Sequence, residues 1–229
     1  MIKIEGTVAP SPEQWYIAIM GARNAMNSWD KSDSEIKYEN VRDSTGKLVI
    51  GPADMKLLMN LRNAGTDERK YMRMLTVHVH ITAPLYWWKE FDTYKVGTVA
   101  NSCSTMHKIH AKEFTRDDFS VEHLIDELDD EDGRYDEWDL EFRCVVSKLN
   151  FARGRFLETK DKRYWWQMIQ LLPSSYNQRR TIMLNYEVLA NMYKSRKNHK
   201  LDEWREFCKW IEGLPYSELI TGKGAENDA

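Results

Sequence analysis

The stretch from Phe91 to His110, FDTYKVGTVANSCSTMHKIH, gathers side chains that could do chemistry: hydroxyls, amides, a cysteine and two histidines. Cys103 could be a nucleophile, but its surroundings match no cysteine-enzyme signature, and a free cysteine commonly packs as a small hydrophobe. No base adjoins the serines in sequence, so an activated serine is unsupported. The remaining hydroxyls and amides indicate either a cluster that binds phosphate or a heterocycle, or a structural turn. They are Thr98, Asn101, Ser102, Ser104 and Thr105, all following Gly97.

A second polar set lies in LLPSSYNQRRTIMLNYEVLANMYKSRKNHKLDEW, residues 171–204. The pattern predicts a helix over 177–196 that carries Asn185, Asn191 and Arg196. Spacings of six and five residues separate them by about 240° and about 140° around a helix, so they do not share one stripe. Amides within an otherwise apolar helix need hydrogen-bond partners when buried. The set therefore fits a helix that meets both a ligand and another subunit, or simply exposed polar positions.

Several other kinds of site are disfavoured. The sequence has neither a P-loop nor a dinucleotide-binding GxGxxG. His78 and His80 lie two residues apart on one face of a predicted strand, but no third ligand follows at an obvious spacing, so we expect a structural role and no metal. Thirteen carboxylates against one arginine between Asp117 and Glu141 indicate a solvated helix face and loop, with a cation site as the alternative.

The overall composition sets the broad class. The 229 residues fit one domain with an ample core, and the net charge of −3 gives no general attraction for nucleic acid. Three cysteines without paired spacing argue against a disulfide framework and fit a reducing cytoplasm. No run approaches the roughly 20 apolar residues of a membrane span, and the first residues lack a signal-peptide core. We expect a soluble, cytoplasmic protein without nucleic-acid or membrane partners.

The periodicities predict an α+β fold: a single domain over 1–220, a small mixed or antiparallel sheet covered by many helices, and a flexible tail over 221–229. A strand over 2–7 precedes a helix with Ser11 as N-cap. A hairpin about Asp43–Gly46 and a helix that stops at Gly65 follow. The later expected elements are a strand over 74–84 and helices over 85–95, 135–157, 160–171, 177–196 and 200–213.

Together the two polar stretches resemble the flavin-dependent thymidylate synthases. That family's signature, R-H-R-x-x-S-x-N-E-x-S-x-R-Y, follows a strand that ends in Ala-Pro. Here HVHITAP occupies the strand, and TYKVGTVANSCSTMH occupies the signature with one residue inserted near Val99. GARNAMNSWD is similar to the family's Ala-Arg-x-Ser-Phe segment and puts Ser28 in a flavin-contacting place. The family's downstream spacing of Leu-Pro, two asparagines, an arginine, a histidine and a tryptophan is matched by Leu172, Pro173, Asn185, Asn191, Arg196, His199 and Trp204.

The chain also departs from the signature. Thr93, Tyr94 and Lys95 stand where the family's signature has Arg-His-Arg. Ile169 stands where the family has a phosphate-binding arginine before the Leu-Pro. An arginine fork that grips a phosphate is not replaced by threonine or isoleucine. Either Arg179, Arg180 or Lys95 binds the phosphate instead, or the substrate differs. The Glu, the last Arg and the Tyr of the family's signature correspond to Ser102, Met106 and His107 in this chain.

The resemblance implies an FAD-dependent methyltransferase of the thymidylate synthase type. It would methylate dUMP or a related pyrimidine nucleotide with methylenetetrahydrofolate and NADPH, as a homotetramer with sites between subunits. The alternative is a non-catalytic or repurposed oligomeric protein of the same fold that binds a flavin or nucleotide. The implied FAD-binding residues are Ser28, Tyr94, Lys95, Asn101, Ser104, Asn185, Asn191 and His199. The implied nucleotide-binding residues are Ser104, Arg179, Arg180 and Arg196, of which Ser104 and Arg196 are the catalytic candidates.

Overall fold

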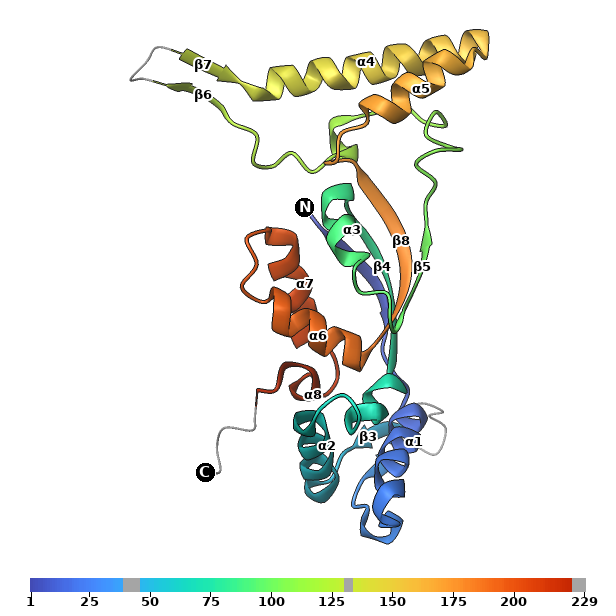
Figure 1. The fold of residues 1–229 in the computed structure, drawn as a ribbon, viewed down its shortest axis with the longest axis vertical. Helices are drawn as coiled ribbons and strands as arrows, with labels where there is room; N and C mark the ends of the chain where they lie inside the picture. Colours follow the sequence, from blue (N-terminus) through green and yellow to red (C-terminus); the bar gives the residue numbers. More distant parts are fainter. Residues whose placement is uncertain (39–45, 130–133, 224–229) are drawn as a thin grey trace. The chain divides into compact units, whose positions relative to one another are not determined.

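The computed structural model describes residues 1–38, 46–129 and 134–223 (Figure 1). Its α+β fold confirms the predicted class: a four-stranded sheet of order β1-β4-β8-β5, two two-stranded hairpins and many helices. The strands are β1 Lys3–Val8, β2 Glu35–Lys37, β3 Lys47–Val49, β4 Thr76–Pro84, β5 Thr98–Ser102, β6 Asp126–Asp129, β7 Arg134–Glu137 and β8 Asn177–Asn185. The α-helices are α1 Pro12–Arg23, α2 Pro52–Ala64, α3 Leu85–Phe91, α4 Trp138–Thr159, α5 Lys162–Leu171, α6 Tyr186–Arg196, α7 Asp202–Glu212 and α8 Glu218–Thr221.

Local signals place the N-terminal helices where the sequence predicts them. Ser11 caps α1: its hydroxyl accepts from the Gln14 N–H, and the Gln14 side chain accepts from the Ser11 N–H in return. Helix α2 ends at Ala64, just before Gly65, whose φ of 126° is open to glycine and costly for other residues. In the described part of the chain, no helix is both long and apolar enough to cross a membrane.

The described residues also include two hairpins. Strands β2 and β3 pair antiparallel, with Ile36 opposite Leu48, as predicted. Three of the predicted turn residues, 43–45, lie outside the described residues. In the acidic segment, β6 and β7 form a second antiparallel hairpin, and 130–133 lie outside the described residues. Not every carboxylate there is a solvated one, because Asp139 is buried and paired with Arg116 and Arg143.

Three predicted helices are wrong in part. Residues 177–185 form strand β8, and the helix begins only at Tyr186, because Asn177–Asn185 pairs within the sheet while alternate side chains such as Gln178, Ile182 and Leu184 become buried. Helix α3 stops at Phe91 instead of continuing to residue 95, since Trp87, Trp88 and Phe91 complete its buried face by then. Residues 135–137 belong to β7.

The described residues form two compact units, and strands β4 and β8 contribute to both. One unit comprises Met1–Lys3, Ile81–Asp92 and Asn101–Arg180, with a core that includes Phe114, Phe119, Leu149 and Met168. The other comprises Ile4–His80, Thr93–Ala100 and Thr181–Ala229, with a core that includes Trp15, Leu58, Tyr186, Trp204 and Phe207. We call them the α4–α5 unit and the α6–α7 unit.

Candidate functional site

Helix α6 carries several of the predicted site residues in the α6–α7 unit. Asn185 is its N-cap: the side-chain oxygen accepts from the Val188 N–H at 2.9 Å. The amide nitrogen lies against Gly97, where an added Cβ would come within 2.4 Å of it. Gly97 also has a φ of 83°, so both its conformation and its lack of a side chain allow Asn185 to cap the helix.

Arg196, at the other end of α6, gathers three predicted residues. Its Nε donates to the Tyr94 hydroxyl at 3.0 Å, and its guanidinium carbon lies 4.8 Å from the centre of the Trp204 ring. The His199 ring packs against Trp204 edge to face at 6.3 Å, and its Nδ1 accepts from the Leu201 N–H. The structure thus brings Tyr94, Arg196 and His199 together around Trp204 in an arrangement that combines cation–π contacts with a charged hydrogen bond.

Asn191 lines a cavity of about 420 Å³, which we call the α6 cavity. Its side-chain oxygen accepts from Arg69 Nη2 at 3.2 Å. Four cations line this cavity, and its described lining contains no carboxylate. A cation-lined hollow of this size suits an anionic small molecule. The lining residues are Arg62, Asn63, Gly65, Thr66, Arg69, Ala190, Asn191, Tyr193, Lys194, Lys197, Ile220 and Thr221.

Glu187 neutralises one of these cations. It is buried in the first turn of α6 and accepts from Arg69 Nε at 3.1 Å and from Arg73 Nε at 2.5 Å. Burial alone would raise the pKa of Glu187, but the hydrogen bonds from Arg73 and Arg69 and their charges outweigh it and lower that pKa. Glu187 therefore stays ionised and fixes both arginines to α6.

Ser28 also lies in this unit, and its hydroxyl and carbonyl oxygens accept from Arg23 Nη1 at 3.5 and 3.0 Å. Arg23 in turn pairs with the buried Asp54. Lys95 is exposed beside Tyr94. Ser28 is thus part of a structural network, in addition to the flavin contact that the resemblance implies.

The remaining predicted residues belong to the α4–α5 unit. The Ser104 hydroxyl accepts from the N–H groups of Met106 and His107 and so stabilises the turn after β5. Arg180 pairs with Asp92 at 2.6 Å and stacks on the Trp88 ring at 4.2 Å, so its charge already has a partner. Asn101 and Arg179 are exposed.

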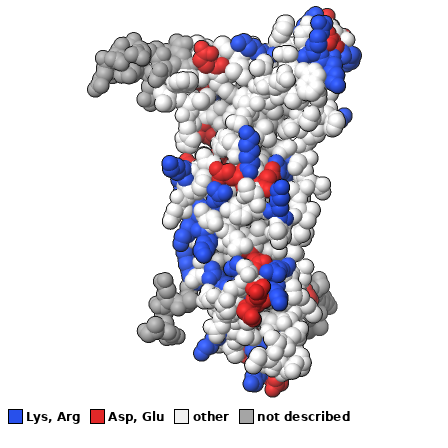
Figure 2. All heavy atoms as spheres, in the orientation of Figure 1, with Lys and Arg blue, Asp and Glu red and all other residues white. Residues whose placement is uncertain are grey.

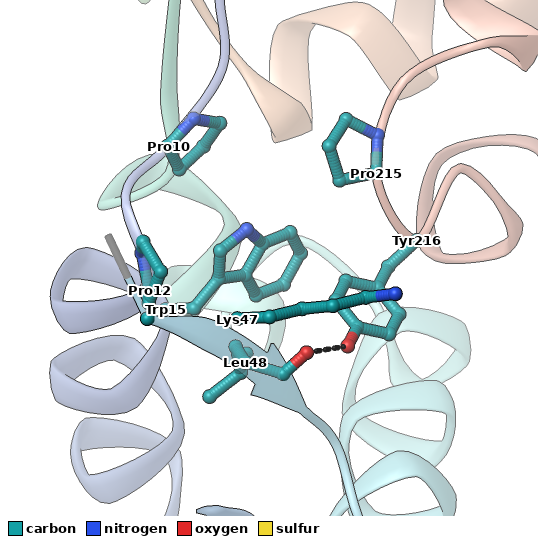
Figure 3. A pocket seen from close by; sticks show the side chains of 8 residues that line it. Pro10, Pro12, Trp15, Lys47, Leu48, Pro215 and Tyr216 are labelled. Atoms are coloured by element: carbon teal, nitrogen blue, oxygen red, sulfur yellow. Dashed lines mark hydrogen bonds between the residues drawn. The ribbon is translucent and has the colours of Figure 1, made fainter. Parts of the chain in front are cut away.

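A larger cavity, of about 480 Å³, lies elsewhere in the α6–α7 unit (Figure 3). None of the predicted site residues lines it. Its walls are mainly prolines, Trp15, Leu48 and Tyr216, and the Tyr216 hydroxyl is already used, donating to the Leu48 carbonyl at 2.7 Å. Lys47 is the only charged side chain among the described residues that line it, so this cavity offers few groups for a nucleotide.

The four cations of the α6 cavity were not among the predicted site residues. Lys194 stands three residues after Asn191, so a helical periodicity puts it on the same face, and this signal was available. Arg62 and Arg69 could not be found in this way, because their places depend on how α2 and the 3-10 helix Arg69–Arg73 pack beside α6.

Among the described residues, the two histidines of β4 have no third side chain placed to complete a metal site. His80 Nδ1 lies 2.9 Å from the Thr181 hydroxyl oxygen, and His78 is exposed. Across residues 1–38, 46–129 and 134–223, no group of three His, Cys, Asp or Glu side chains could hold a metal ion.

Solved structures share this architecture. The flavin-dependent thymidylate synthase ThyX from Helicobacter pylori, complexed with FAD and dUMP, is 16% identical, with 95% of each chain covered and a TM-score of 0.61. The UMP/dUMP methylase PolB from Streptomyces cacaoi, bound to 5-Br dUMP, is 13% identical, covers 97% of this chain and 95% of its own, and has a TM-score of 0.59. No protein-family model and no curated protein matches the sequence. At these identities the likeness shows the fold: that of the flavin-dependent thymidylate synthases.

Proposed function

We propose that this chain is a divergent flavoprotein of the thymidylate synthase type, which methylates dUMP or a related pyrimidine nucleotide. The observation that carries the proposal is the position of Asn191. This residue corresponds to the second asparagine of the family's downstream spacing, and it lines a cation-rich cavity in a fold shared with complexes of FAD and dUMP. The methylene group would come from methylenetetrahydrofolate and the electrons from NADPH.

The chemistry of the α6 cavity fits part of an FAD molecule. Its amide side chain can hydrogen-bond a heterocycle, and its cations can bind phosphate. FAD, when bound, supplies the redox chemistry, and the protein binds and orients it. Asn191 would hold the flavin, while Tyr94 and His199 would orient it and Arg196 would bind the pyrimidine nucleotide. Ser28, Lys95, Asn101, Ser104, Asn185, Arg179 and Arg180 retain their proposed roles from the resemblance. The site would be completed in a cytoplasmic homotetramer.

A second function is favoured by specific residues: a repurposed binder of a flavin or nucleotide without catalysis. Thr93 and Ile169 stand where the family places arginines, and Arg180 is already paired with Asp92. This alternative shares the ligand with the first proposal and differs in the absence of turnover. It predicts retained FAD with no dUMP-dependent oxidation of NADPH.

The proposal is tested by the absorbance spectrum of the purified protein after incubation with FAD and gel filtration. We expect flavin absorbance to stay with the protein. Asn191→Ala should release most of it, because the amide's hydrogen bonds to the ligand are lost and each is worth about 0.5–1.5 kcal/mol.

The matched control is Asn60→Ala, which changes an exposed asparagine on α2 outside the cavity lining. It should retain flavin like the unaltered protein. Equal flavin content in the Asn191 and Asn60 variants would contradict the assignment of α6. A protein that takes up no FAD would contradict the flavoenzyme proposal itself.

A further inference from the structure

Arg62 lines the α6 cavity, and no described carboxylate forms an ion pair with it. It is partly buried at the end of α2, and it donates to the backbone carbonyls of Leu219 and Ile220 at 2.9 and 3.0 Å and to the side-chain oxygen of Asn63. All three acceptors are neutral. Burial lowers the pKa of Arg62, and the nearby charge of Arg69 lowers it further. A guanidinium in this position gains stability when an anion approaches it.

Lys194 in α6 and Lys197, the C-cap residue of that helix, add further positive charge. Lys194 and Lys197 line the same cavity, and neither has a carboxylate partner in the part of the chain that the structure describes. Arg69 differs from them, since Glu187 is bonded to it. Figure 2 shows Lys and Arg side chains, with Asp and Glu side chains among them, over the region of α6, α7 and α8. The cavity therefore has three cations whose charge the described residues do not balance.

We propose that Arg62, Lys194 and Lys197 form an anion-binding subsite that takes the phosphate of the ligand in the α6 cavity. This rests on the proposed function, in which that ligand is a flavin nucleotide or a pyrimidine nucleotide. A phosphate carries up to two negative charges and acceptor oxygens that match an arginine fork and lysine ammonium groups. Ile169 replaces the arginine that the family uses for phosphate, so the binding role passes to cations on other elements.

The experiment measures binding of inorganic pyrophosphate, riboflavin and riboflavin 5′-phosphate by titration calorimetry. The unaltered protein should bind pyrophosphate, and it should bind the phosphorylated flavin more tightly than riboflavin. In the double variant Lys194→Gln, Lys197→Gln, pyrophosphate affinity should fall about tenfold or more, because charged hydrogen bonds are lost. The preference for the phosphorylated flavin should fall by a similar factor, while riboflavin affinity stays unchanged.

Lys56→Gln is the matched control, since it removes one exposed lysine from α2 outside the cavity. Arg62→Lys is a second variant that keeps the charge but loses the fork, and it should give a smaller loss. Thermal melts establish that every variant is folded.

The outcomes separate the subsite from the proposed function. Pyrophosphate binding that depends on the two lysines supports the subsite even in a protein that takes up no flavin. A protein that binds riboflavin but not pyrophosphate, or that loses no pyrophosphate affinity in the lysine variant relative to Lys56→Gln, overturns the subsite and leaves the flavin proposal standing.

Discussion

At the scale of single residues, Arg196 shows how a side chain can be prepared for a ligand. Its guanidinium is oriented by the Tyr94 hydroxyl and by the face of Trp204. The side chain is partly buried, and these contacts restrict its rotamer. Such an arrangement reduces the entropy lost when a ligand binds.

We expect Arg196→Ala to weaken dUMP binding at least tenfold, because a charged hydrogen bond is worth about 1.5–3 kcal/mol. Equilibrium titration with dUMP measures this. Arg163→Ala, which removes an exposed arginine on α5, should leave the affinity unchanged. Equal affinities in the two variants would remove Arg196 from the site.

At the scale of elements, the start of α6 shows what a sequence pattern can and cannot predict. The capped N-terminus of α1 and the end of α2 before Gly65 were predictable, because a cap, a proline and a terminating glycine are local signals. The strand-to-helix change at Asn185 was missed, because TIML fits both periods and pairing within the sheet decides between them. Asn185 was expected inside a helix, whereas it is the residue that begins one.

The contact between Gly97 and Asn185 gives a test of this junction. Gly97→Ala should lower the free energy of unfolding by about 1–3 kcal/mol, since it strains a left-handed backbone and pushes the new Cβ into the capping amide. Urea unfolding measures the change.

A control for this substitution is Gly154→Ala in α4, where an added Cβ meets no atom within 4 Å. It should stabilise the protein slightly, because alanine favours a helix over glycine. If Gly97→Ala and Gly154→Ala change the free energy of unfolding equally, the junction is not tightly packed.

At the scale of the whole molecule, the sequence predicted the fold class but not the α6 cavity. Asn191, Arg196 and His199 were proposed as site residues because their spacing along one chain segment resembles that of the family. Arg62 comes from α2, more than a hundred residues earlier, and reaches the cavity only through tertiary packing. Unpaired charge is likewise a property of the fold, because it depends on which carboxylates end up nearby.

Stability at low pH is also a whole-molecule property, and it depends on a buried carboxylate. Asp54 is fully buried and accepts hydrogen bonds from Arg23 Nε at 2.6 Å and from the hydroxyls of Ser34 and Ser32 at 2.6 and 2.7 Å. Burial alone would raise the pKa of Asp54, but these hydrogen bonds and the Arg23 charge outweigh it and lower that pKa. The ionised form is thus favoured in the folded state.

The pKa of Asp54 is lower in the folded chain than in the unfolded chain. Its contribution to the free energy of unfolding is therefore complete above the ordinary carboxyl pKa of about 4, and it is lost as the pH falls through the pKa of the folded state. The lowered pKa of Glu187 likewise makes the folded chain more stable above that range. We expect the free energy of unfolding in urea to fall from about pH 5 downward.

Asp54→Asn should lower the free energy of unfolding by about 3–5 kcal/mol at neutral pH, because Arg23 is left buried without its partner. Asp54→Asn should also flatten the acid decline, whereas the exposed Asp30→Asn should leave it intact. A decline as steep in Asp54→Asn as in the unaltered protein would mean that other carboxylates control acid unfolding.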